Sequence, residues 1–248
     1  MNLERIVADL VEKIEHRFYG KYRGIVVDNQ DPAKLGRLKL KVPSVLGSDV
    51  VTGWATPCVP YGGAADQGIL FIPEVDAGVW TEFEEGDLEF PIWAGTFWSQ
   101  PNSESELPKP NQSSDGSEES NVQDPPTSKI IKTAKGHTLQ FEDADDSEMI
   151  LVREGSQGHF LTMDKNGITL TDANANTIQF TSKGINVNDA NKNTIQMTSN
   201  GIQIKDLTGN TIDMSSGAFT ITSKVPLKID ASGQTVTMVG DSIDLQKG

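Results

Sequence analysis

The first candidates for chemistry are five carboxylates that crowd between residues 82 and 89: Glu82, Glu84, Glu85, Asp87 and Glu89. Two carboxyl groups at a suitable separation act as acid and base in glycosidases. Here, however, the acidic residues alternate with Phe83 and Leu88 around a Glu-Gly-Asp turn. That pattern is typical of the solvated side of a hairpin. Because the sequence offers no other convergent set of catalytic residues, we do not expect an enzyme.

Two further stretches resemble the start of a calcium loop, Asp172 to Asn176 and Asp189 to Asn193. A calcium loop of this kind needs glycine at its sixth position and glutamate at its twelfth. Both stretches have threonine at the sixth position, and the twelfth is Lys183 or Asn200. We therefore interpret them as turns between strands, with weak cation binding as the alternative.

The histidines and the cysteine are isolated from one another. His16, His137 and His159 lie in different segments, and Cys58 is the only cysteine, which excludes an intrachain disulfide. Three copies of one histidine could meet on a symmetry axis and bind a metal, but a surface or turn position is the simpler interpretation. We predict no catalytic residue, no cofactor and no metal site.

The element that must position any functional surface is a repeat of 17 residues, which extends from Phe160 to Ile221. Thr177 to Asn193 is followed in the same frame by Thr194 to Asn210, and looser copies lie at residues 138–141 and 235–245. Within each repeat, apolar residues alternate in two short runs separated by turn-forming residues, which indicates two strands with one buried face. A fixed period of this length is typical of a stacked, elongated architecture.

One repeat has too few apolar residues to be stable alone. Four inward side chains contribute about 6 to 12 kcal/mol at roughly 1.5 to 3 each, whereas ordering the repeat costs roughly 25 kcal/mol. We therefore predict that identical stripes meet in a homotrimer with the form of a triangular prism. A single-chain solenoid is the alternative. The predicted trimer core is Leu161, Met163, Ile168, Leu170, Ile178, Phe180, Ile185, Val187, Ile195, Met197, Ile202, Ile204, Ile212, Met214, Phe219 and Ile221.

The first half of the chain has a different pattern. Residues 1–19 carry apolar residues at helical spacing, which predicts one amphipathic helix. Strands are expected at 22–27, 37–42, 50–55, 68–72, 78–84 and 89–97, with turns between them. Five or six short strands in so few residues suit a small closed barrel of the OB-fold type.

These residues resemble a known family. Tyr22 to Pro32, Leu35 to Pro43, Trp54-Ala55, Phe71 to Asp87 and Pro91 to Gly95 are similar, in order, to the OB domain of baseplate assembly protein V. That family includes the central spikes of contractile phage tails and the valine-glycine repeat spikes of type VI secretion. The resemblance covers roughly residues 20–98, and it implies a trimeric β-helical needle after the barrel.

The expected fold is thus all-β, with an N-terminal helix (1–19), an OB-fold barrel (20–98), a polar linker (99–128) and a needle (129–248) that is an intertwined trimeric β-helix. At one layer per 8.5 residues, residues 130–245 would form a shaft of roughly 65 Å. The linker is too short for the lysozyme domain that some members of the family insert there. The large hub region of type VI spikes is also missing, which implies a separate hub protein at the OB end.

The resemblance further implies a structural spike that is driven through the target cell envelope when a sheath contracts. The sequence ends without the His-x-His iron site of some needle tips, so we expect a PAAR-like tip protein at the C-terminal end. Assembly in the cytoplasm of the producing cell, followed by incorporation into a virion tail or an injection-system baseplate, is the expected localisation.

Composition argues against several other functions. The formal charge of -14 over 248 residues, without a basic segment, disfavours nucleic acid as a partner. The acidic residues among positions 3–18 exclude a secretory signal, and no apolar run is long enough to span a membrane. The competing hypothesis is a binding module, in which an OB barrel on a β-helical stalk captures glycans or oligonucleotides as an adhesin does.

Overall fold

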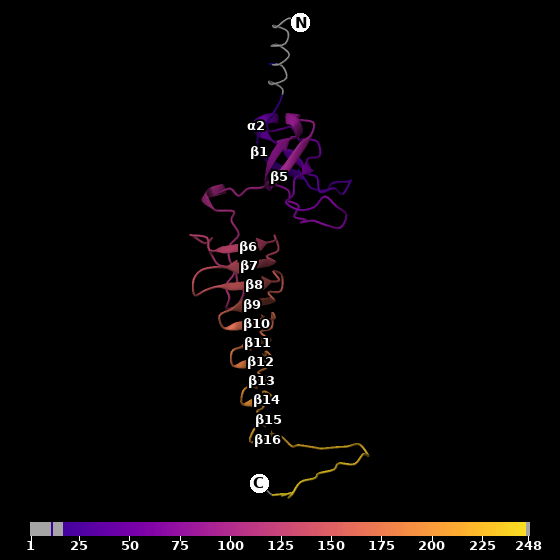
Figure 1. Cartoon of the computed structure of the whole chain (residues 1–248), viewed down its shortest axis with the longest axis vertical. Helices are drawn as coiled ribbons and strands as arrows, with labels where there is room; N and C mark the ends of the chain where they lie inside the picture. Colours follow the sequence, from indigo (N-terminus) through magenta and orange to yellow (C-terminus); the bar gives the residue numbers. More distant parts are fainter. Residues whose placement is uncertain (1–10, 12–16, 247–248) are drawn as a thin grey trace. The chain divides into compact units, whose positions relative to one another are not determined.

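The computed structural model describes residue 11 and residues 17–246, and the chain divides into two compact units at Leu107 and Pro108 (Figure 1). The amphipathic helix predicted for residues 1–19 falls almost wholly outside the described residues. The division falls within the predicted linker (99–128), and residues 108–128 of that linker belong to the second unit.

The first unit is built on a five-stranded sheet in the order β2-β1-β4-β5-β3. Its strands are β1 (Tyr22–Asp28), β2 (Lys39–Lys41), β3 (Thr56–Pro57), β4 (Gly78–Phe83) and β5 (Pro91–Thr96). Antiparallel bridges from Leu38 to Ala55 and from Lys41 to Val51 join the two edges of the curled sheet. Short helical segments, α2 (Pro43–Leu46), η1 (Glu84–Gly86) and η2 (Pro101–Ser103), lie between and after the strands.

The strand predicted at 68–72 is wrong. Gly68 has φ +150° and Pro73 follows. Among the described residues, the one backbone hydrogen bond of this stretch to its surroundings is from the Ile69 N–H to the Tyr61 carbonyl, at 3.1 Å. The alternation of apolar residues there reflects an exposed loop, in which Leu70 and Phe71 face water. Periodicity alone does not distinguish such a loop from a short strand.

The barrel core follows from the alternation of each strand. In β4 every second side chain is buried, which is the pattern of a strand with one face inward. The Trp93 indole donates a hydrogen bond to the Gly36 carbonyl at 3.1 Å, so its polar atom is satisfied. The buried cluster consists of Val26, Leu38, Leu40, Val42, Ala55, Val79 and Trp93.

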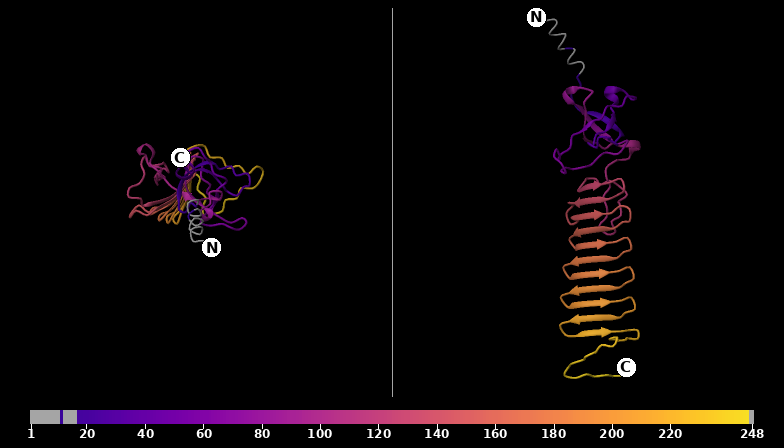
Figure 2. Two further views of the ribbon diagram at one scale, coloured as in Figure 1. Left: turned by 90° about the horizontal axis from the view of Figure 1, so that it is seen from above. Right: turned by 90° about the vertical axis from the view of Figure 1, so that its right-hand side faces the viewer.

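The second unit contains one sheet of eleven strands, here called the long sheet, in which every strand pairs antiparallel with its neighbours in sequence (Figure 2). The strands are β6 (Ser128–Lys132), β7 (Thr138–Glu142), β8 (Met149–Arg153), β9 (Phe160–Asp164), β10 (Gly167–Thr171), β11 (Thr177–Thr181), β12 (Gly184–Asn188), β13 (Thr194–Thr198), β14 (Gly201–Lys205), β15 (Thr211–Ser215) and β16 (Phe219–Thr222). The prediction of two strands per 17-residue repeat is confirmed.

Glycine at the start of alternate strands allows this close stacking. Gly184 has φ +135°, and a Cβ atom there would lie 1.9 Å from the Met197 carbonyl oxygen on β13. Gly167 and Gly201 have the same geometry against β11 and β15. Only glycine adopts this conformation without a steric clash, so glycine is a backbone requirement at these three positions.

The long sheet ends earlier than the sequence suggests. Eleven strands at roughly 4.8 Å per step span about 48 Å, compared with the predicted 65 Å, because the described residues after Thr222 form no strand. Backbone hydrogen bonds between strands are nevertheless satisfied within one chain along the whole ladder.

Candidate trimer interface

One face of the long sheet carries two continuous columns of apolar side chains. The register places Ile178 opposite Val187 and Phe180 opposite Ile185, and Ile185 in turn faces Met197. Because side chains alternate across a strand, residues two apart project from the same face. All sixteen predicted core residues occupy such positions on β9 to β16, where the pairing aligns them into the two columns.

One of the two columns continues through the first three strands of the sheet, whereas the other continues through β8 and β7 and ends at β6, where Lys129 lies opposite Phe141. Phe141 lies opposite Ile150, and Leu139 lies between Ile131 and Val152. The prediction omitted these residues because the 17-residue period is weaker before Phe160. The alternation in Thr138-Leu-Gln-Phe141 was the available signal.

This face is open in the single chain. Phe180 is 47% exposed and Phe219 is 64% exposed, and most other members of the columns are also classed as exposed. Monomeric soluble proteins rarely leave a continuous apolar surface of such extent in water, and one that persists marks an interaction site. The arrangement is therefore suited to packing against another apolar surface along the full length of the ladder.

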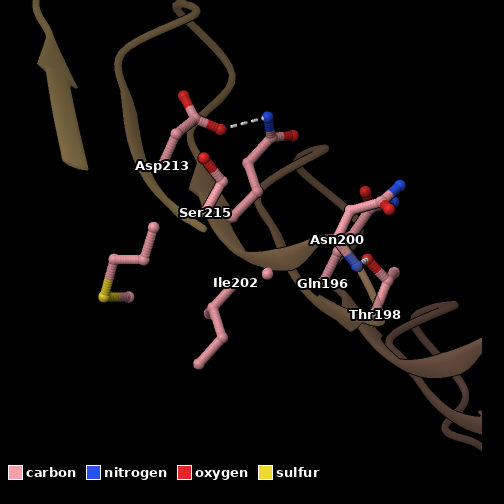
Figure 3. A pocket seen from close by; sticks show the side chains of 9 residues that line it. Gln196, Thr198, Asn200, Ile202, Asp213 and Ser215 are labelled. Carbon is pink, nitrogen blue, oxygen red and sulfur yellow. Dashed lines mark hydrogen bonds between the residues drawn. The ribbon is translucent and has the colours of Figure 1, made fainter. Parts of the chain in front are cut away.

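The opposite face of the long sheet is polar over β10 to β15. Its central column runs, in register, through Thr169, Gln179, Asn186, Gln196, Gln203 and Asp213. The Gln203 amide donates to Asp213 Oδ1 at 2.5 Å, and hydrogen bonds from Gln203 and Thr211 hold the pKa of Asp213 below its usual range. Figure 3 shows Ile202 on the other side of the ribbon from Asp213 and Ser215. The two faces of the sheet therefore have different chemistry.

Residues 108–127, here called the cap segment, cover this second face at the start of the ladder. The Asn111 N–H donates to Gln140 Oε1 at 2.6 Å, and Gln140 Nε2 donates to the Asn111 carbonyl at 3.2 Å. The Lys132 ammonium pairs with Glu118 at 2.6 Å, which lowers the pKa of that carboxyl. Leu151 is fully buried on this face. The predicted polar linker thus includes a packed segment, which sequence reasoning missed because each contact joins residues far apart in the chain.

The two calcium-like stretches are hydrogen-bonded turns. Asp189 Oδ1 accepts the backbone N–H groups of Asn191 at 2.9 Å and Asn193 at 2.7 Å, while Oδ2 accepts the Asn193 side-chain amide at 2.7 Å. Hydrogen bonding, first from the Asn193 side chain, lowers the pKa of Asp189. Asp172 has equivalent partners. These carboxylates are occupied as turn acceptors, in agreement with the interpretation as inter-strand turns.

Successive turns are also linked to one another along one edge of the sheet. His137 Nδ1 accepts the Gly155 N–H at 3.1 Å, and His159 Nδ1 accepts the Ala173 N–H at 3.1 Å. The asparagines that end later turns accept a backbone N–H from the next turn in the same way. The five acceptors are His137, His159, Asn176, Asn193 and Asn210. Two of the three histidines thus have turn roles, and His16 lies outside the described residues.

The acidic cluster of the first unit is a surface hairpin around η1. Glu82 pairs with Lys21 at 2.5 Å and Asp87 with Arg17 at 3.1 Å, all with partly exposed side chains. Asp87 Oδ1 also accepts the Glu89 N–H at 3.1 Å. Residue 11 and residues 17–246 contain no group of three or more histidine, cysteine, aspartate or glutamate side chains placed to bind a metal.

A basic and aromatic contact on the barrel was not evident in the sequence. The Arg37 guanidinium and the Lys39 ammonium lie 5.7 and 5.0 Å from the Trp54 ring centroid. Arg37 also donates two hydrogen bonds to Asp31, at 2.7 and 3.1 Å, and they hold the pKa of that carboxyl well below its usual range. Because Asp31 neutralises Arg37, the contact is explained by packing within the barrel.

Comparison with protein families gives two matches. Residues 22–98 match the type VI secretion system/phage-baseplate injector OB domain, and residues 128–192 match the phage baseplate V C-terminal trimerisation domain. No curated protein matches the chain. Within the part of the chain that the structure describes, no helix has the length and apolar character to cross a bilayer. The two matched domains together span more than half of the chain, in the expected order. The protein therefore belongs to the phage-baseplate V and type VI secretion spike family.

Proposed function

We propose that this protein is the central spike of a contractile injection apparatus, a phage tail or a phage-derived particle. The observation that carries the proposal is the apolar face of the long sheet, whose two columns run from β7 to β16 and are open in the single chain. The match to a trimerisation domain supports a homotrimer. Three copies facing inward would bury all sixteen predicted core residues in one shared interior and leave the polar face toward solvent.

A prism of this kind is suited to transmit force. The strands lie across the ladder, so their interstrand hydrogen bonds run along it and join each layer to the next. The acceptors that connect successive turns add a second row of bonds in the same direction. The mechanism is therefore mechanical, and stiffness of the assembled needle is the functional property.

The proposed setting follows the family. The OB unit would attach to a separate hub protein below the inner tube, and the C-terminal end would carry a PAAR-like tip protein. On sheath contraction the spike would be driven through the target cell envelope. Assembly would take place in the cytoplasm of the producing cell, before incorporation into the virion tail or baseplate.

The test is the number of chains in the purified full-length protein. Light scattering should give about 81 kDa, three times the 26.9 kDa of one chain, and the oligomer should resist SDS and heat. A stably folded monomer in dilute solution would contradict the proposal. Glycan arrays and single-strand oligonucleotide binding should both be negative, whereas a specific signal in either would favour the adhesin-like alternative.

A further inference from the structure

The chain beyond β16 carries the sequence of another hairpin but forms no strand. Thr235 to Gln246 aligns without a gap with Thr194 to Lys205, the segment that forms β13, its turn and β14, and Ser242 takes the position of Gly201. The apolar positions coincide, with Val236 and Met238 in the first strand and Ile243 and Leu245 in the second. In Figures 1 and 2 the same segment continues as a trace without arrows.

These apolar side chains are unusually exposed. Val236, Met238 and Ile243 are more than half exposed and Leu245 is 90% exposed, and Leu227 and Ile229 just before the hairpin sequence are also more than half exposed. Apolar side chains at every second position of an extended stretch place one apolar side on it, and such a side is normally covered by another surface. The segment therefore lacks a partner.

Physical reasons explain why one chain does not fold this segment. An isolated two-stranded hairpin is marginally stable in water. Pro226, which follows the last strand β16 in the chain, lacks an N–H group to donate to a neighbouring strand. In the long sheet β16 is the terminal strand, so one edge of it presents unpaired backbone groups that can accept another strand.

We propose that residues 225–246 of three chains fold together into the last layers of the needle, and that this segment becomes ordered only on trimerisation. The occupant of each exposed apolar stripe is the same segment of the sister copies, because the two apolar columns of the long sheet end at Phe219 and Ile221 on β16, the strand that this segment follows in the chain. This inference rests on the proposed trimeric spike. Three added strands would extend the ladder by about 14 Å at roughly 4.8 Å each, to about 62 Å, close to the length expected from the sequence.

Hydrogen exchange of the full-length protein tests the proposal. Backbone amides within 235–246 should exchange at least about a hundredfold more slowly than in an unstructured peptide of the same sequence, as expected for amides in a stable ladder. Val236→Asp should abolish this protection while the trimer mass and the protection of β10 to β15 persist. Thr237→Asp, whose counterpart Gln196 lies on the polar face, is the matched control and should change neither quantity.

The outcomes separate this inference from the proposed function. A trimer in which β10 to β15 are protected but 235–246 exchange freely would refute the terminal layers and leave the spike intact, with a separate tip protein as the remaining occupant. Protection of 235–246 in a monomeric species would refute coupling to trimerisation. A protein that is monomeric throughout would refute both proposals.

Discussion

Replacing Ile185 by aspartate tests the packing of the apolar columns most directly. Ile185 lies on β12 between Phe180 on β11 and Met197 on β13, so in a trimer three copies of it share one level of the interior. Losing the buried side chain costs roughly 1.5 to 3 kcal/mol per chain. Leaving a carboxylate buried without a partner costs about 3 to 5 kcal/mol more.

The total over three chains is about 14 to 24 kcal/mol, even before repulsion between the three carboxylates is counted. Since each 1.4 kcal/mol changes an equilibrium constant about tenfold, the association constant should fall by at least ten powers of ten. The variant should therefore remain unassembled at micromolar concentration. Light scattering after size exclusion measures this as a shift from about 81 kDa to the 26.9 kDa chain.

The matched control is Asn186→Asp, which adds the same charge one residue further along β12. Asn186 lies in the central column of the polar face, between Gln179 and Gln196, so its carboxylate would remain in water and the variant should stay trimeric. An Ile185→Asp protein of normal trimer mass would refute the assignment of this face to the interior. Loss of assembly in both variants would show that charge anywhere on β12 is not tolerated.

Three further predictions concern the stability of the sheet. Gly184→Ala should destabilise the protein by more than about 2 kcal/mol in denaturant titration, because its Cβ would lie 1.9 Å from the Met197 carbonyl oxygen. The control is Gly217→Ala, whose Cβ would have no atom within 4 Å and which should have little effect. Equal unfolding midpoints for the two variants would contradict the stacking geometry. Gln140→Ala should destabilise the protein by about 2 to 6 kcal/mol, since it leaves two buried backbone groups of Asn111 unpaired, and it should make the cap segment sensitive to protease. The control is Gln179→Ala, which changes the same column of the sheet beyond the cap segment. Unchanged proteolysis of the Gln140→Ala protein would argue against the packing of the cap segment. Backbone hydrogen bonds from Gln157 and Ser156 lower the pKa of Glu154 to about 2. As the pH falls, Glu154 is therefore protonated in the unfolded chain before it is protonated in the folded protein. The stability that this carboxylate contributes is complete above about pH 4.5 and is lost as the pH falls toward about 2. The melting temperature of Glu154→Gln should vary less with pH across that window, and an unchanged slope would contradict the contribution.

Much of the candidate interface was predictable because the pattern is local and repeated. The pairs Ile178 with Phe180 and Ile185 with Val187 recur at a fixed spacing, and a two-residue period assigns them to one face of a strand whatever the strand pairs with. The turn residues Asp172 and Asp189 were also interpreted correctly, because aspartate followed by asparagine favours local hydrogen bonds.

Errors arose where the deciding contact is distant in the sequence. The strand predicted at 68–72 has suitable alternation, but no neighbouring strand lies beside it in the barrel. Asn111 carries no sign in the sequence that it binds Gln140, and the histidines at 137 and 159 gave no sign that their rings accept backbone N–H groups of the following turns.

The sequence by itself determined that the second half is a stack of short strands with one apolar stripe, because side-chain alternation and turn composition depend only on near neighbours. The tertiary structure decided which strands pair, that each pairs with the next in the same chain, and that the stripe aligns into two columns that are unbroken from β7 to β16. Register is the physical reason, because a shift of one residue at any strand would move its apolar side chains to the other face. Only the folded ladder shows that all eleven strands keep the same register.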